Sequence, residues 1–146
     1  MVFDICYTEY MQFYKTKSSL LPGTSYSEVY KSAQRVFKVL KSHTKRKPYV
    51  RSKYFRGEKV FFDLFWIHMT QKSLKERYKR LKYFEASLDV IRDSRYNPEI
   101  RQNPHKKSEV FYRFGGMTRD GTCFYVQIKE NVKTRTKQCM SVFPAK

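Results

Sequence analysis

Proton transfer near neutral pH could come from three histidines, His43, His68 and His105. They lie far apart in the chain and lack the spacing of metal ligands. The sequence has no Asp/Glu cluster of the kind that holds Mg²⁺ in two-metal nucleases, no Walker loop and no Gly-x-Gly-x-x-Gly motif. We therefore expect no metal, no cofactor and no nucleotide-triphosphate chemistry. RNA cleavage remains open, because the RNA 2′-hydroxyl supplies the nucleophile and the protein adds acid–base groups and cations.

The charge of the chain favours a polyanionic partner. Its 146 residues include 31 Lys and Arg against 13 Asp and Glu, a net charge of +18 that is shared between both halves. Such an excess repels itself in a compact chain. RNA or DNA is the first partner to consider, since cations mixed with many aromatic residues suit phosphates and bases. An anionic membrane surface is second, although no stretch approaches the roughly 18 apolar residues of a transmembrane helix. An acidic protein, such as an antitoxin, an immunity protein or a host protein, is third.

Two helices carry the same start signal. Ser25 precedes Glu28, and Ser73 precedes Glu76, by the three-residue spacing of a capping box. Apolar residues at helical spacing then predict a helix up to residue 42 and a helical region over 74–94, with a kink near 85–87 that could divide it.

The segment 41–59 changes character. It carries eight Lys or Arg against one Glu, with Pro48 and Gly57 inside. This composition predicts a basic loop or linker. Its interleaved aromatic residues favour contact with nucleic acid, whereas a merely solvated connector is the alternative. The nucleic-acid contacts expected here are Arg46, Lys47, Arg51, Lys53 and Arg56.

The C-terminal third is predicted to be sheet. Strand patterns cover residues 109–114, 123–130 and 136–143, and Asp120-Gly121 is typical of a hairpin turn. Residues 1–14 fit a strand or a short helix. We expect an α+β fold whose N-terminal helical part packs on a small C-terminal antiparallel sheet of three or four strands. Residues 1–59 would be a helical and basic extension of a domain over 60–146, unless the whole chain forms one compact domain.

The cysteines and the first residues suggest a location. Cys6, Cys123 and Cys139 are odd in number and contain no Cys-x-x-Cys pair, so we expect reduced thiols. Residues 1–10 contain Asp4 and Glu9 and no basic run, unlike a signal peptide. Both observations suit a cytoplasmic protein that does not act at a membrane.

Several motifs follow one another in a fixed order between residues 60 and 146. They are Phe65-Trp66-Ile67-His68, a basic helical region, Tyr96-Asn97-Pro98-Glu99-Ile100, strands containing Phe111 to Phe114 and Phe124 to Lys129, and Met140-Ser141-Val142-Phe143-Pro144. This order resembles the barnase–EndoU–colicin–RelE group of nucleases, especially its phage-associated branch. Each motif is loose, and the order carries the resemblance.

The resemblance implies a compact α+β fold and a metal-independent endoribonuclease of the toxin or phage-effector kind. By position it places His68 at the helical histidine of the group, Arg113 and Lys129 at basic strand positions, and Ser141 at the terminal Ser or Thr. Our hypothesis makes His68 the general base or acid. Arg77, Arg113 and Lys129 would stabilise charge on the phosphate, and Ser141 would hydrogen-bond a phosphoryl oxygen.

Each assignment has a structural alternative. His68 adjoins Trp66 and Met69 and could be a packing residue. The arginines of the helical region could be solvated, the strand cations could belong to a solvated sheet face, and Ser141 could be an ordinary strand residue. The remaining expected nucleic-acid contacts are Arg80, Arg92, Tyr112, Arg119 and Tyr125. Two other functions stay open: DNA or RNA binding without catalysis, and an inhibitor-like protein that docks on an acidic partner.

Overall fold

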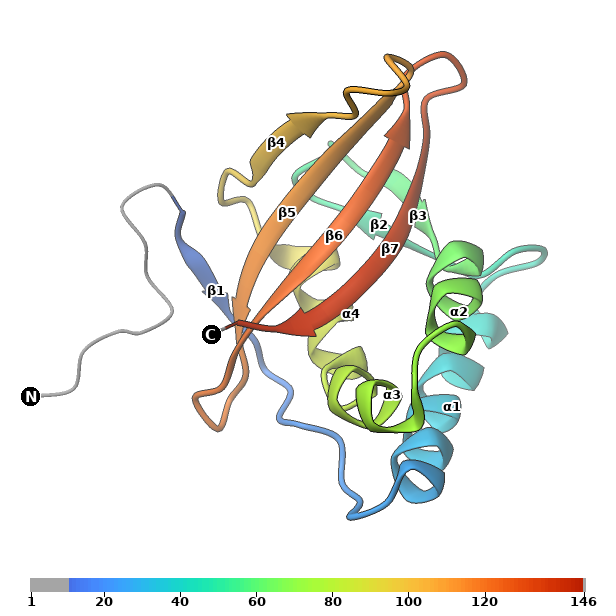
Figure 1. Ribbon diagram of the computed structural model, residues 1–146, viewed down its shortest axis with the longest axis vertical. Helices are drawn as coiled ribbons and strands as arrows, with labels where there is room; N and C mark the ends of the chain where they lie inside the picture. The colour runs from blue at the N-terminus through green and yellow to red at the C-terminus, as the bar shows by residue number, and fades with distance from the viewer. Residues whose placement is uncertain (1–10, 146) are drawn as a thin grey trace, which may run out of the picture.

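The computed structural model describes residues 11–145, which form one curved sheet with helices against it (Figure 1). The helices are α1 (Tyr26–Ser42), α2 (Asp63–Thr70), α3 (Leu74–Leu81) and α4 (Phe84–Asp93). The strands are β1 (Phe13–Lys15), β2 (Tyr49–Ser52), β3 (Glu58–Phe61), β4 (Glu99–Gln102), β5 (Glu109–Met117), β6 (Cys123–Asn131) and β7 (Thr136–Pro144). Their order in the sheet is β1-β5-β6-β7-β3-β2, and β4 also pairs with β5.

This sheet corrects the expected fold. The α+β class holds, but the sheet has seven strands spread along the described chain and is mixed, instead of being a small C-terminal antiparallel sheet. The parallel pairs are β1 with β5 and β3 with β7. Because parallel partners come from distant parts of the chain, no hairpin signal announces them. Only the antiparallel set β5–β6–β7 follows the predicted pattern.

The helix starts are confirmed. The Ser25 hydroxyl accepts a hydrogen bond from the Glu28 backbone N–H at 3.3 Å, and the Ser73 hydroxyl accepts one from the Glu76 N–H at 3.2 Å. These contacts satisfy N–H groups that have no partner within the helix. The helical region over 74–94 is two helices, and it divides at residues 82–83.

Helix α4 packs in the core behind β5 and β6 (Figure 1). Its apolar residues, Phe84 and Ile91 among them, are buried in one cluster with Phe124 and Val126 of β6. Gly116 permits this packing, because a Cβ there would lie 2.5 Å from the Phe124 ring. Among residues 11–145, the strands therefore turn one face to α4, and no described helix covers the other face in the same way.

The basic segment 41–59 is only in part a loop, which corrects a second expectation: residues 49–52 form β2, and β3 begins at residue 58. Its residues form the antiparallel pair β2 and β3, and Val50 and Val60 of this hairpin are buried. The division into an extension and a domain stays a prediction. Its boundary at residue 59 falls within β3, which pairs with both β2 and β7.

The structure also bears on the expectations for the cysteines and for membrane-spanning helices. Cys139 is free and buried, whereas Cys123 is disulfide-bonded, so the expectation of reduced thiols is wrong for Cys123. Cys6 lies outside the described residues, as does most of the segment 1–14. None of the helices within residues 11–145 combines the length and apolarity needed to cross a membrane.

Candidate nucleic-acid interface

A row of polar side chains crosses the uncovered side of the sheet. Gln127 of β6 pairs with Arg113 of β5 on one side and with Ser141 of β7 on the other. Directly paired residues of adjacent strands share a face. Their neighbours Phe114, Val126 and Val142 are buried against the helices, so this row points the other way. We call this side, carrying Arg113, Gln127 and Ser141, the open sheet face.

An aromatic row lies beside the polar row on the same face. Phe13 pairs with Gly115, Gly115 with Tyr125, and Tyr125 with Phe143. The ring centroids of Phe13 and Tyr125 are 5.4 Å apart, and those of Tyr125 and Phe143 are 5.6 Å apart. Gly115 lets the Phe13 ring lie directly on the strand, since a Cβ there would come within 2.8 Å of it.

Two guanidinium groups lie against this aromatic row. The Cζ of Arg113 is 5.4 Å from the Tyr125 ring centroid and 5.3 Å from that of Phe143. Arg80 reaches the same place from α3: its Cζ is 5.6 Å from the Phe143 centroid, and its Nη1 donates to the Ser141 hydroxyl at 3.0 Å. The only carboxylate ion-paired with Arg80 within residues 11–145 is that of Glu76, at 3.4 Å. Such rings hold cations in place while leaving their N–H groups available to an anion.

His68 stands next to this pair, near the end of α2. It lines a narrow hollow together with Lys72, Arg80, Met140 and Ser141. A β-bulge at Met140 shifts the register between β6 and β7 beside this hollow, and such irregularities often re-aim a side chain. Burial lowers the pKa of His68 below its ordinary value, and the nearby charges of Lys72 and Lys129 lower it further. The imidazole is therefore neutral at pH 7 and able to accept a proton.

His68, Arg80 and Ser141 thus line one hollow, and Arg113 is linked to it by the Phe143 ring that it shares with Arg80. These four residues are named the cleavage cluster after the reaction proposed for them below. The sequence predicted all four as site residues, with Arg80 as a binding residue. It missed Lys72, Gln127 and Phe143. For Gln127 and Phe143 the period-two alternation of β6 and β7 was the available signal, since Gln127 lies between two buried residues and Phe143 follows the buried Val142.

Arg77 lies away from this cluster. Its Nε donates to the Lys72 carbonyl at 2.9 Å, and its Nη2 donates to the Thr70 carbonyl at 2.6 Å. Its Cζ also lies 5.8 Å from the Tyr26 ring centroid. These bonds satisfy carbonyl groups at the end of α2. Arg77 thereby fixes the turn after His68 without pointing a free guanidinium at the open sheet face.

Lys129 lies on the open sheet face but already has an acidic partner. Its Nζ is 3.2 Å from Glu109 Oε2. Hydrogen bonds from Asn103 and Lys129 lower the pKa of Glu109, so the carboxylate is charged at neutral pH. The predicted role of Lys129 at a phosphate therefore competes with an existing ion pair.

The other predicted binding residues are dispersed. Tyr125 is on the open sheet face, whereas Tyr112 points to the opposite side, where its hydroxyl donates to Glu130 at 2.7 Å. Arg92 pairs with Asp89 on α4 at 3.5 Å, and Arg119 is exposed in the turn between β5 and β6.

The cations predicted in segment 41–59 do not share one environment. Arg51 donates to the Gly57 carbonyl at 2.9 Å, and Lys53 pairs with Asp93 at 3.5 Å. Arg56 is exposed in the hairpin turn, where its φ is 57°. Arg46 and Lys47 line a hollow beside Tyr49, and Lys47 also pairs with Asp63 at 3.2 Å.

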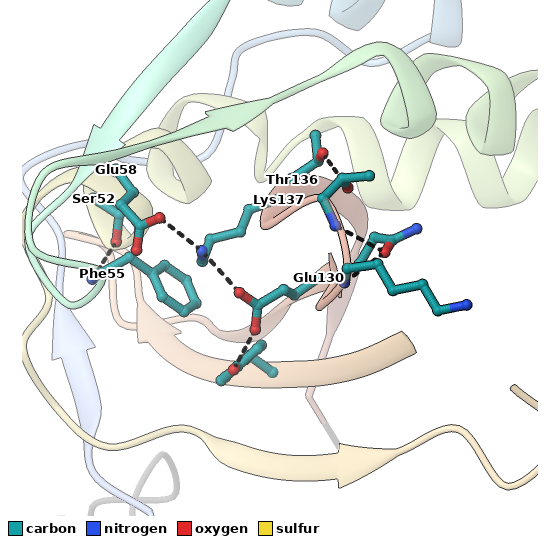
Figure 2. Close-up of polar contacts among 10 residues, drawn as sticks. Ser52, Phe55, Glu58, Glu130, Thr136 and Lys137 are labelled. Carbon is teal, nitrogen blue, oxygen red and sulfur yellow. Dashed lines mark hydrogen bonds and ion pairs between the residues drawn. The ribbon is translucent and has the colours of Figure 1, made fainter. Parts of the chain in front are cut away.

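A buried ion network occupies the helix-facing side of the same sheet, where Lys137 of β7 lies between two carboxylates (Figure 2). The Lys137 side chain is 3% exposed, and its Nζ is 2.9 Å from Glu130 Oε2 and 3.1 Å from Glu58 Oε2. Although burial alone raises the pKa of Glu130, hydrogen bonds from Lys137 and Tyr112 lower it overall. Sequence reasoning missed this network.

Residues 11–145 hold no group of three or more His, Cys, Asp or Glu side chains arranged to bind a metal ion. No protein-family model, no curated protein and no solved structure matches the chain. The function must therefore be argued from the open sheet face itself.

Proposed function

We propose that the protein binds RNA across the open sheet face and cleaves it at the cleavage cluster without a metal ion. The observation that carries this proposal is the meeting of Arg80 and Arg113 on the Phe143 ring, beside His68 and Ser141. Two cations with few carboxylates next to a neutral histidine suit a phosphodiester.

Binding follows from the two rows of the open sheet face. Unpaired bases stack on aromatic rings such as Phe13, Tyr125 and Phe143, while arginines contact the phosphates. The net charge of +18 strengthens the attraction for any strand and makes it sensitive to salt.

Cleavage would be an internal transesterification. His68 takes the proton of the ribose 2′-hydroxyl, and the 2′-oxygen attacks the adjacent phosphorus. The bond from phosphorus to the 5′-oxygen breaks, leaving a 2′,3′-cyclic phosphate, and the 5′-oxygen takes up a proton from protonated His68 or from water. Arg80 and Arg113 stabilise the negative charge that builds up on the phosphoryl oxygens. Ser141, held by Arg80, donates its hydroxyl hydrogen to one of these oxygens.

The test is incubation of the purified protein with a labelled RNA oligonucleotide in excess EDTA. We expect cyclic-phosphate products from the wild type and a rate lower by about 10²–10⁴-fold in His68→Ala. His105→Ala, which changes an exposed histidine in a distant turn, should leave the rate unchanged. DNA of the same sequence should stay intact, because it lacks the 2′-hydroxyl. Intact RNA, an equally active His68→Ala variant or cleaved DNA would refute the mechanism.

One observation favours a second candidate function, nucleic-acid binding without cleavage. The hollow beside His68 has a free volume of only about 10 Å³, so a ribose reaches His68 only if neighbouring side chains move. In that case the protein would bind RNA or DNA with a steep salt dependence and yield no cleavage products.

Partner and location follow from the same proposal. An acidic protein that covers the open sheet face would inhibit the activity by competing with RNA for Arg80 and Arg113. The expected place of action is the cytoplasm because RNA substrates are found there; the disulfide at Cys123 removes the argument from reduced thiols.

A further inference from the structure

A second basic and aromatic hollow lies at the far edge of the sheet. Between α1 and β2 the chain runs through residues 43–47, and this segment, with Tyr49, Lys59 and Phe61 of the β2–β3 hairpin, lines a volume of about 730 Å³. We call it the hairpin hollow. Its size falls within the range of pockets that hold small organic ligands.

The hairpin hollow shares a face of the sheet with the cleavage cluster. Tyr49 pairs with Phe61, Phe61 with Gln138, Gln138 with Lys129, and Lys129 with Phe111. These pairs form one row across five strands, and Phe61 and Lys129 alternate with the buried Val60 and Ile128. The rings of the hollow therefore belong to the same side of the sheet as Arg113 and Ser141.

Helix α2 joins the two places. It starts at Asp63, two residues after Phe61, and carries His68 near its other end. His68 lies five positions after Asp63, which is an axial rise of about 7.5 Å in an α-helix. A strand of a few nucleotides spans such a distance, so one RNA strand can occupy both places.

The lining of the hairpin hollow matches an unpaired nucleotide. It contains Lys45, Arg46, Lys47 and Lys59 and no acidic residue. Within residues 11–145 neither Lys45 nor Arg46 forms an ion pair, whereas Lys47 is held by Asp63 at 3.2 Å. Two cations are thus left for a phosphate.

The aromatic rings of the hollow favour a base over a bare anion. The Tyr49 and Phe61 centroids are 6.0 Å apart in an edge-to-face arrangement, and Lys59 Nζ lies 4.6 Å from the Tyr49 centroid. Only an unpaired base reaches such rings, because the bases of a duplex are stacked inside it.

We propose that the hairpin hollow binds one nucleotide of a single-stranded RNA whose scissile phosphate lies at the cleavage cluster, with the base on Phe61 and the phosphate between Lys45 and Arg46. This inference rests on the proposed function for the position of the cut, but the binding step is measurable without cleavage.

The binding test uses an uncleavable 2′-O-methyl RNA of twelve nucleotides, labelled with a fluorophore, and full-length protein. We compare Lys45→Ala/Arg46→Ala with the matched control Lys31→Ala/Lys38→Ala, which removes two exposed charges from α1 outside the hollow. Loss of the contacts to the single phosphate between Lys45 and Arg46 should reduce the slope of log K against log salt by about 0.7 relative to the control. Equal slopes and affinities for the two double variants would overturn the proposal.

The ring is tested separately by Phe61→Leu, which keeps an apolar side chain but removes the stacking surface. We expect about tenfold weaker binding of the single strand and no change for a duplex of the same sequence. The melting temperature is recorded for each variant, and Lys45→Ala/Arg46→Ala keeps the test valid if Phe61→Leu unfolds. If both variants lost the same affinity for the duplex as for the single strand, the hollow would contact only the RNA backbone, and the proposal would also be overturned.

Cleavage kinetics separate this inference from the proposed function. If the protein cleaves RNA, Lys45→Ala/Arg46→Ala should raise KM for the twelve-nucleotide RNA about tenfold and leave both kcat and the cleavage of a dinucleotide unchanged. If neither the wild type nor any variant cleaved RNA, but Lys45→Ala/Arg46→Ala still reduced the salt slope, the cleavage mechanism would be refuted and the hollow would remain a binding site. If Lys45→Ala/Arg46→Ala slowed the cleavage of the dinucleotide as much as that of the twelve-nucleotide RNA, the hollow would not be a separate site.

Discussion

The two faces of the sheet formed by β5, β6 and β7 both carry cations, but the cations have opposite surroundings on the two faces. On the helix-facing side Lys137 is buried and contacts two carboxylates, Glu58 and Glu130 (Figure 2). On the open side Arg113 lies on the rings of Tyr125 and Phe143 and hydrogen-bonds to Gln127 at 3.5 Å. Among the described residues no carboxylate is ion-paired with Arg113.

This difference separates structural cations from those available to a ligand. Carboxylates neutralise Lys137 and compensate the cost of burying its charge. Aromatic rings orient a guanidinium but leave its charge and most of its N–H groups unsatisfied, so that a phosphate can still bind. Lys129, which lies on the open face but is paired with Glu109, is an intermediate case.

The largest expected effect is on folding stability. Lys137→Met leaves Glu130 half-buried and without its cation, so we expect the free energy of unfolding to fall by about 3–5 kcal/mol. Chemical denaturation measures it, with the exposed Lys133→Met as the matched control. Adding Glu130→Gln to Lys137→Met should restore part of the loss. A loss below about 1 kcal/mol in Lys137→Met would mean that the buried network is not structural.

Arg113→Met should lower the rate of cleavage and leave folding stability unchanged, in contrast to Lys137→Met. We expect kcat for RNA cleavage to fall about 100-fold, because a charge-stabilising donor is removed, and the melting temperature to stay close to that of the wild type. The control is Arg95→Met, which removes an exposed arginine from the segment between α4 and β4. A stability loss in Arg113→Met as large as that in Lys137→Met would remove the distinction between the two faces.

The pH dependence of cleavage tests the state of His68. Its pKa is lowered, first by burial and then by Lys72 and Lys129, and only the neutral form accepts the proton. The rate should therefore rise about tenfold per pH unit at low pH and level off with a midpoint below the ordinary value of about 6.5. Lys72→Met removes one positive neighbour and should move the midpoint up. A rate that falls as the pH rises through this range would instead make His68 the acid.

Lys129→Ala should have the smallest effect. Because Glu109 already neutralises Lys129, its loss should change the affinity for uncleavable RNA and kcat by less than about fivefold. Fluorescence titration and single-turnover cleavage measure these two quantities. A fall of 100-fold in kcat would give Lys129 the catalytic role that its strand position predicts. An ion pair with a carboxylate would then not distinguish Lys129 from Arg113.

Much of the secondary structure was predictable because its signals are local. The capping boxes at Ser25 and Ser73 start α1 and α3 as expected, and the alternation in β5, β6 and β7 reports their two faces. The same alternation was enough to point Arg113 away from the core. Segment 41–59 was misread as a linker, because its many charges obscured the short strands around Val50 and Val60.

The positions of the charged groups depend on partners that are distant in the chain. Arg77 and Arg80 are three residues apart on one helix, yet one binds carbonyls at the end of α2 and the other binds Ser141, 61 residues away. No local pattern distinguishes them, because the destination of a long side chain is set by what tertiary packing brings near it.

The sequence by itself determined the basic charge of the folded chain, the starts of α1 and α3 and the antiparallel strands at the C-terminus, since composition, capping and alternation involve neighbouring residues. The tertiary structure alone decided the parallel pairing of β3 with β7, the burial of Lys137 with Glu58, 79 residues away, and the convergence of His68 with Arg80 and Ser141. The physical reason is that strand edges and charges are satisfied by any suitable partner in space, and only the complete fold selects which partner that is.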